Sequence, residues 1–154
     1  MIRRALILAM GFCGIAGAAA APAVAAETVS GPIRAEVLRV LDGDTIEIRA
    51  QVWLQLALTS HVRIRGIDTP EMRGACLEEK TMAAAARDRL AELAGNEIRL
   101  ANISDDKYFG RVVADVTTGD GATSLGEAML ASGLARPYDG TARGDWCATG
   151  TIAH

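Results

Sequence analysis

Residues 62–71, with the sequence VRIRGIDTPE, form the most informative stretch of this chain. Apolar residues alternate with arginines in its first part, which is the pattern of a β-strand with one buried face. The strand then ends in a proline turn that carries Asp68 and Glu71. The sequence DGDT at residues 42–45 precedes this stretch by the length of a hairpin. We therefore predict that the two acidic segments lie together at the open base of one long hairpin.

The sequence on either side is also patterned as strands. Thr45–Leu56 alternates strictly between apolar and polar residues, which predicts a long antiparallel strand with one buried face. We expect the chain to turn back over Leu58–His61. In Ile33–Leu41 the apolar residues shift from one face to the other, which predicts a strand with a bulge. Two shorter strands are expected at Glu97–Ile103 and Arg111–Thr117.

Two helices complete the expected fold. Leu77–Ala94 has a helical composition and is followed by the stop residues Gly95 and Asn96. Its predicted buried stripe consists of Met82, Ala86, Leu90 and Leu93. A capping box at residues 124–127 opens a second, short helix that ends near Gly133. This order of elements predicts an OB-fold, a five-stranded β-barrel with two packed helices, in the α+β class.

Residues 1–26 are predicted to be a signal peptide and not part of the fold. Arg3 and Arg4 precede an apolar, alanine-rich stretch that is short for a membrane span, and small residues at 24–26 offer a cleavage site. A retained N-terminal anchor is the alternative. Export to the periplasm or the exterior would leave residues 27–154 as one domain. We expect this domain to be a monomer, free of the membrane and without a stable protein partner.

The charge of the chain limits how it can bind a polyanion. Losing Arg3 and Arg4 with the leader lowers the formal net charge from −3 to −5. A net acidic protein is not a general nucleic-acid coat. A nucleic acid would therefore have to bind at a local positive site, helped by a bound cation.

The cysteines predict a disulfide. Cys13 leaves with the leader, so Cys76 and Cys147 remain as a pair that an oxidising compartment would join. The loop closed by this bridge has roughly 70 residues, for which chain entropy predicts a stabilisation of about 4 kcal/mol. Two buried free thiols are the alternative.

The acidic motifs predict a site for a hard cation. Each has a simple explanation when taken alone, because Asp-Gly is a hairpin signal and a proline turn ends a strand. Together they bring several carboxylates to one place, which suits an oxygen-liganded cation, and Ca²⁺ tolerates an irregular, hydrated ligand set better than Mg²⁺. His61 lies in an expected turn and His154 ends the chain, so the sequence holds no cluster suited to zinc.

Three arginines and one glutamate could act on a phosphodiester. Arg63 and Arg65 share one face of their strand, and Arg111 begins a later strand. Any one of them could be an ordinary surface residue, but together they could clamp a phosphate. With no histidine in place, Glu71 is the candidate base, with an unperturbed pKa of about 4.3. Arg65 could contact phosphate or pair with a nearby acid.

At these motifs the chain resembles the thermonucleases similar to staphylococcal nuclease. The resemblance covers residues 35–138 and rests on DGDT, VRIRGIDTPE, DKYFGR and GLARPY. It implies an OB-fold barrel and a calcium-dependent nuclease that cleaves DNA and RNA to leave 3′-phosphates. It also implies roles for individual residues: Asp44, Asp68 and the Thr69 carbonyl hold calcium, Asp42 supports them, and Arg63, Glu71 and Arg111 are catalytic.

Two departures from the family pattern affect substrate binding. Phe109 is an insertion beside Lys107 and Tyr108, the residues expected to bind substrate, so either aromatic ring could stack on a base. After Tyr138 the chain is too short for a further helix, and a bridge from Cys147 to Cys76 could replace it as a tether.

The leading hypothesis is thus an exported, calcium-dependent nuclease. The alternative is a non-catalytic OB module that binds single strands or a protein partner through aromatic and basic groups. The small number of aromatic residues and the acidic charge weaken that alternative. A phosphodiesterase for a small nucleotide is a third possibility.

Overall fold

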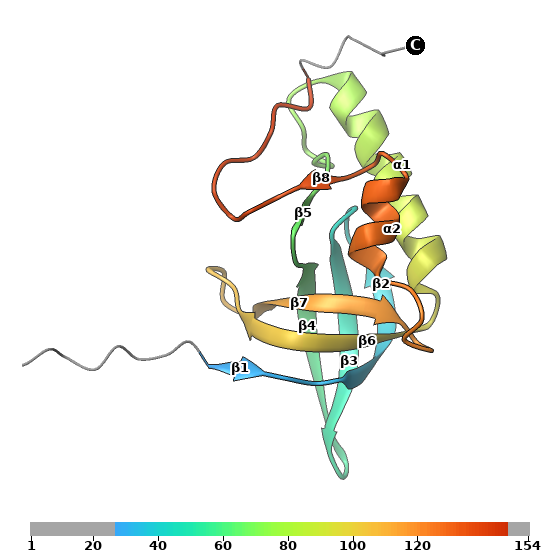
Figure 1. The fold of residues 1–154 in the computed structure, drawn as a ribbon, viewed down its shortest axis with the longest axis vertical. Helices are drawn as coiled ribbons and strands as arrows, with labels where there is room; N and C mark the ends of the chain where they lie inside the picture. Colours follow the sequence, from blue (N-terminus) through green and yellow to red (C-terminus); the bar gives the residue numbers. More distant parts are fainter. Residues whose placement is uncertain (1–26, 148–154) are drawn as a thin grey trace, which may run out of the picture.

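Five strands close into a barrel in the computed structural model, which describes residues 27–147, and two helices lie against one end of it (Figure 1). The predicted leader, residues 1–26, and residues 148–154 lie outside the described part. In chain order the elements are β1 (Thr28–Val29), β2 (Ile33–Val40), β3 (Thr45–Trp53), β4 (Leu56–Ile64), β5 (Ile67–Asp68), α1 (Leu77–Ala94), β6 (Glu97–Asp105), β7 (Arg111–Thr118), α2 (Leu125–Ala131) and β8 (Arg136–Pro137).

The barrel is mixed, with one parallel contact. Strands β2, β3 and β4 form an antiparallel meander, and β6 pairs antiparallel with both β2 and β7. The barrel closes where β4 pairs parallel with β7, so that Arg63 lies opposite Val113. The predicted OB-type barrel with two helices is therefore confirmed. The short strands β1, β5 and β8 were not predicted, since two-residue strands leave no periodic pattern.

Alternating side chains of the barrel strands and one face of each helix fill the core. The buried apolar side chains come from strands β2 to β7 and from both helices, and the largest are Ile46, Ile64, Ile67, Ile98, Leu90, Leu125 and Met129. The predicted bulge in β2 is present, because the register with β3 shifts between Val37 and Arg39. A bulge of this kind bends the strand and so helps a small sheet to close.

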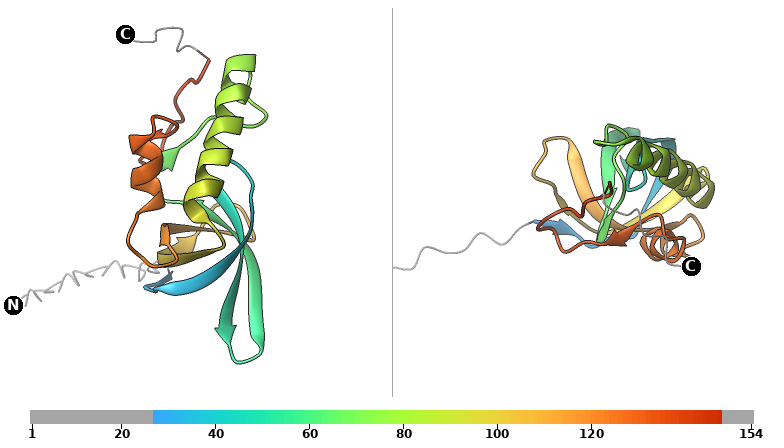
Figure 2. Two further views of the ribbon diagram at one scale, coloured as in Figure 1. Left: turned by 90° about the vertical axis from the view of Figure 1, so that its right-hand side faces the viewer. Right: turned by 90° about the horizontal axis from the view of Figure 1, so that it is seen from above.

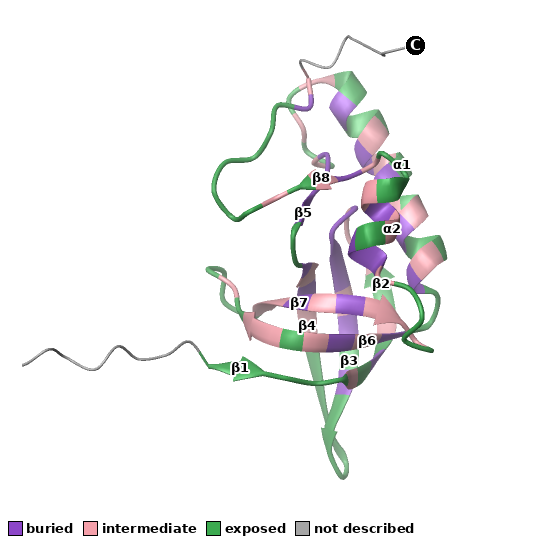
Figure 3. Ribbon diagram, in the orientation of Figure 1, coloured by how far each residue is buried: buried purple, intermediate pink, exposed green. Residues whose placement is uncertain are grey.

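The predicted turn of the β3–β4 hairpin is wrong. The chain turns at Leu54 and Gln55, not over Leu58–His61, and Gln55 has a positive φ of 63°. No glycine, proline or asparagine marks this turn, and the apolar alternation runs straight through it. The hairpin extends beyond the barrel (Figure 2), and its tip is exposed (Figure 3), including Trp53 at 74%. The alternation of apolar and polar residues at the tip of this hairpin therefore does not reflect burial.

Helix α1 has the predicted bounds but a different buried face. Ala83, Ala86, Leu90 and Ala94 are buried, whereas the expected Met82 and Leu93 are only half-buried. Small side chains let the helix approach the barrel closely. A Cβ atom on Gly43 would lie 2.7 Å from the Cβ of Ala86, so a glycine is required at the contact.

The C-terminal segment returns to the start of α1. After α2, which is capped by Ser124 as predicted, β8 pairs with β5, so that Arg136 lies opposite Asp68. The chain then arches outward and comes back to α1 (Figure 1), where Cys147 and Cys76 form the predicted disulfide with Cα atoms 5.9 Å apart. No helix within residues 27–147 is long and apolar enough to cross a membrane.

Candidate nuclease site

An open cavity of about 760 Å³ lies at the rim of the barrel. The three predicted catalytic residues, Arg63, Glu71 and Arg111, all line it. Lys107 and Tyr108, the predicted substrate-binding residues, line it too. The fold thus brings these five side chains around one space. Asp44 and Asp68 are buried beneath it and contact Arg63.

Arg63 lies at the boundary between the cavity and the buried acids. It is near the end of β4, and only 14% of its side chain is exposed. One terminal nitrogen lies 2.7 Å from Asp44 Oδ2, and the other donates to the carbonyl of Ile67 at 3.2 Å. The ring of Tyr138 lies 5.6 Å from its guanidinium carbon. These contacts hold the guanidinium in one orientation at the cavity wall.

Asp44 is a buried acid with an incomplete set of partners. It is 2% exposed, and its Oδ1 accepts a hydrogen bond from Thr45 Oγ1 at 2.8 Å. Its Oδ2 is close to Arg63 but accepts no hydrogen bond of acceptable geometry. Burial raises the pKa of Asp44 to about 7; the negative charge of Asp42 adds to the effect, and Arg63 opposes it.

Asp68 and Thr69 are held by two residues that sequence reasoning did not single out. Arg143 Nε donates to Asp68 Oδ1 at 2.6 Å, and its Nη2 donates to the Thr69 carbonyl at 3.1 Å. The indole of Trp146 donates to Asp68 Oδ2 at 3.0 Å. Both predicted ligands are therefore already bound to donors from the C-terminal segment.

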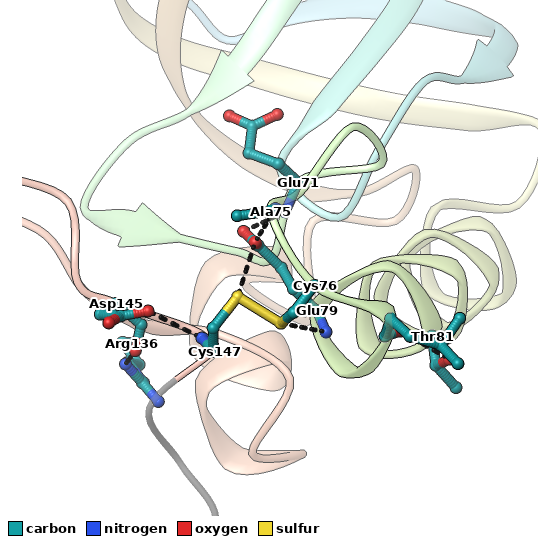
Figure 4. Close-up of a disulfide and its surroundings, with 9 residues drawn as sticks. Glu71, Ala75, Cys76, Glu79, Thr81, Arg136, Asp145 and Cys147 are labelled. Atoms are coloured by element: carbon teal, nitrogen blue, oxygen red, sulfur yellow. Dashed lines mark hydrogen bonds between the residues drawn. A yellow bond between two sulfur atoms is a disulfide. The ribbon is translucent and has the colours of Figure 1, made fainter.

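Glu71 is fixed from two directions. Its backbone N–H donates to Glu79 Oε1 at 3.3 Å, and its carboxylate forms an ion pair with Arg143. Glu79 is buried and also accepts from Ala75 N at 2.8 Å, so it ties the loop of Glu71 to α1. Figure 4 shows Glu79 between this loop and the disulfide. Gly74 makes room for it, because a Cβ there would lie 2.3 Å from Glu79.

The opposite wall of the cavity is basic, aromatic and more exposed. Arg111 Nε donates to Asp106 Oδ2 at 2.8 Å. Although burial acts to raise the pKa of Asp106, the hydrogen bond and charge of Arg111 lower it below its usual value. Tyr108 stacks 4.6 Å from Arg111, and Phe109 beside it is fully exposed.

Arg65 pairs with an acid, which was one of its two predicted roles. Its Nε lies 3.3 Å from Asp115, and its Nη2 donates to the carbonyls of Asn102 and Val113. It also lines the cavity, so it contributes positive charge there without touching the buried acids.

The described residues contain one cluster of three side chains of the metal-binding kinds, formed by Cys76, Glu79 and Cys147. Both sulfurs belong to the disulfide, so neither is a thiolate that could bind zinc. Glu79 Oε2 lies 3.6 Å from Cys147 Sγ, and this is a contact only, because a disulfide sulfur has no proton to donate.

The residues around Asp44 have the chemistry that a calcium ion requires. Asp44, Asp68 and Thr69 supply two carboxylates and one carbonyl, all hard oxygen ligands. Asp44 Oδ2 is buried and accepts no hydrogen bond of acceptable geometry, although Arg63 lies 2.7 Å away, so its coordination is one that a cation could complete. These three residues therefore fit the ion. Guanidinium groups now contact all three, because Arg143 donates to Asp68 and Thr69, and Arg63 lies beside Asp44.

An OB-type barrel with acids, arginines and an aromatic ring at one rim defines a class of nuclease-like or nucleic-acid-binding proteins. The family described as Staphylococcal nuclease homologue matches residues 61–145, more than half of the chain, and the chain belongs to this family. No match is found among curated proteins. Membership indicates a nuclease-like or nucleic-acid-binding function and a nucleic acid as the partner.

Proposed function

We propose that the protein is an exported, calcium-dependent nuclease that hydrolyses phosphodiester bonds of DNA and RNA and leaves 3′-phosphates. The supporting observation is the cavity at which Arg63, Glu71 and Arg111 meet, directly above the buried Asp44 and Asp68. The family match supports the general class. The signal-peptide pattern of residues 1–26, ahead of one folded domain, supports export.

The arginines would bind the phosphate undergoing cleavage. Arg63 is held by Asp44 and Ile67, and Arg111 by Asp106, so both guanidinium groups are oriented before substrate arrives. Donors fixed in this way stabilise negative charge as it builds in the transition state, without reorganising.

Glu71 would orient the attacking water and accept its proton. Its loop is anchored through Glu79, and its carboxylate reaches the cavity that Arg63 and Arg111 line. Asp44, Asp68 and the Thr69 carbonyl would hold Ca²⁺ beneath the cavity. When bound, such an ion supplies Lewis-acid stabilisation of a phosphoryl oxygen.

Cleavage of single-stranded DNA with added calcium, and with excess chelator, tests this function in one gel assay. The proposal expects cleavage that needs calcium and yields products that a 3′-phosphatase can modify. Chelator-resistant cleavage would remove the calcium-based mechanism. Binding without any product would replace it with the second candidate.

The second candidate is a non-catalytic module that binds single strands. The exposed Tyr108 and Phe109 beside Lys107 favour it, since aromatic rings next to cations are the usual platform for unstacked bases. Such binding would persist in chelator, and the substitution Glu71→Gln would also leave it unchanged.

A further inference from the structure

Arg143 occupies a position for which the proposed catalytic chemistry has no use. Its guanidinium contacts three acceptors at once, the carboxylate of Asp68, the carbonyl of Thr69 and the carboxylate of Glu71. The first two are oxygens assigned above to a cation, and the third is the proposed base. A bound positive charge is thus already present in the ligand set, supplied by the protein itself.

The C-terminal segment that carries Arg143 is itself anchored at several points. Trp146, which is 5% exposed, donates to the other oxygen of Asp68, and the guanidinium of Arg136 lies 3.9 Å from its ring. Arg136 also donates to the carbonyl of Asp145, whose side chain accepts from Cys147 N at 2.8 Å. The disulfide then fastens Cys147 to the start of α1. We call residues 139–147 the strap.

We propose that Arg143 is a built-in competitor of the metal ion: the strap seats its guanidinium on Asp68 and Thr69, and a divalent cation must displace it to bind. This inference rests on the proposed calcium site. An ion and a guanidinium cannot share the same carboxylate lone pairs at 2.6 Å without strong repulsion between their charges.

The consequence is a calcium affinity weaker than the ligand set alone would give. If Arg143 is seated in nine-tenths of the molecules, the apparent dissociation constant rises about tenfold over its intrinsic value. Arg143 has room to leave, since 39% of its side chain is exposed at the edge of the open cavity. Once released, its guanidinium would remain beside the cavity.

Calcium titration of Arg143→Gln by calorimetry tests the inference. We expect the dissociation constant to fall at least about tenfold relative to the unmodified protein. Arg65→Gln is the matched control, because it removes the same charge from a residue lining the same cavity that does not contact Asp68 or Thr69. A general electrostatic effect would tighten binding equally in both variants, and that result would overturn the inference.

Trp146 offers a second readout that does not depend on activity. Replacing the exposed Trp53 by Phe leaves Trp146 as the one tryptophan, in contact with Asp68. Calcium should change its fluorescence over the same concentration range as the calorimetric signal, and Arg143→Gln should shift that range downward. An unchanged midpoint in Arg143→Gln would contradict the proposal.

The role of the strap is tested by a double-mutant cycle. Cys76→Ser with Cys147→Ser removes the tether and keeps a capping oxygen at the start of α1, where the Cys76 sulfur now accepts from Glu79 N. We expect this pair of changes to tighten calcium binding in the unmodified chain and to have no effect in Arg143→Gln. An equal effect in both backgrounds would mean that the strap does not act through Arg143.

The outcomes also separate this inference from the proposed function. Calcium binding of equal strength in the unmodified protein and in Arg143→Gln would overturn the competition alone and leave the metal site intact. A failure of every variant to bind calcium at millimolar concentration would overturn both.

Discussion

The floor and the rim of the cavity are built in opposite ways. The floor, formed by Asp44, Asp68, Thr69 and Arg63, is buried, and its charges are paired at fixed distances. The rim, formed by Lys107, Tyr108 and Phe109, is exposed on the loop between β6 and β7. Buried, paired charges give directed chemistry, whereas an exposed aromatic loop can adapt to different bases. Changes at the floor should therefore affect turnover and stability, and changes at the rim should affect affinity.

The largest expected effect is that of Glu71→Gln, at the edge of the floor. Loss of the carboxylate should lower kcat by about 100-fold or more, because a positioned base contributes on that scale, while KM changes little. Steady-state kinetics on single-stranded DNA measure both kcat and KM. Glu78→Gln is the control, the same substitution at an exposed acid in the first turn of α1. Similar kinetics for both variants would remove Glu71 from the mechanism.

Removing the disulfide should have the next largest effect, this time on stability. Cys76→Ser with Cys147→Ser should lower the free energy of unfolding by about 4 kcal/mol, because the bridge closes a loop spanning most of the domain. Urea unfolding followed by circular dichroism measures the change. Reducing agent should produce a similar loss in the unmodified protein and none in the variant. An unchanged unfolding midpoint would show that the strap is not coupled to the stability of the barrel.

A smaller effect is expected at the rim. Tyr108→Ala should weaken binding of single-stranded DNA by about 1–3 kcal/mol, the usual cost of losing one stacked base, and raise KM with kcat nearly unchanged. Phe109→Ala should show which ring does the stacking. Trp53→Ala is the matched control, since Trp53 is also an exposed aromatic residue but lies at the end of β3, at the tip of the β3–β4 hairpin. Equal losses in all three would place the nucleic acid elsewhere.

A further expected effect is a pH dependence of stability that originates in Asp44. Its pKa is about 7 in the folded chain and 3.8 ordinarily, so between these values the folded state binds a proton that the unfolded state has lost. Stability without calcium should therefore fall as pH rises from about 4 to 7. Asp44→Asn, which cannot ionise, should lack this component. Unfolding in chelator at pH 5 and pH 7 compares the two proteins, and parallel pH slopes would contradict the assignment.

Much of this arrangement could be predicted from local sequence. Burial against one core produces a periodic pattern of apolar residues in the sequence. This pattern explains why the alternation in Thr45–Ala50, the bulge in β2 and the bounds of α1 could be predicted. The gathering of Arg63, Glu71 and Arg111 followed from the hairpin and the family resemblance. The turn at Gln55 could not be predicted, because the hairpin tip is outside the core and carries no turn residue.

Arg143 and Trp146 were missed for a different reason. They lie in the sequence GTARGDWC, which has no periodicity and no known motif, and their partners Asp68 and Thr69 are more than 70 residues away. The disulfide was the one signal that could have found them, since a bridge from Cys147 to Cys76 brings its neighbours to the loop of Glu71.

The parallel pairing of β4 with β7 also bears on when activity can first arise. This pairing is what carries Arg111 to the side of the barrel where Arg63 lies, and the two strands are separated in the chain by all of α1 and β6. A nascent chain, or a partly translocated one under the proposed export, would therefore hold the two arginines of the proposed phosphate clamp apart. If the proposed function holds, only a molecule whose last barrel strand has docked could cut, so the unfinished protein would be harmless to the nucleic acid of the cell that synthesises it.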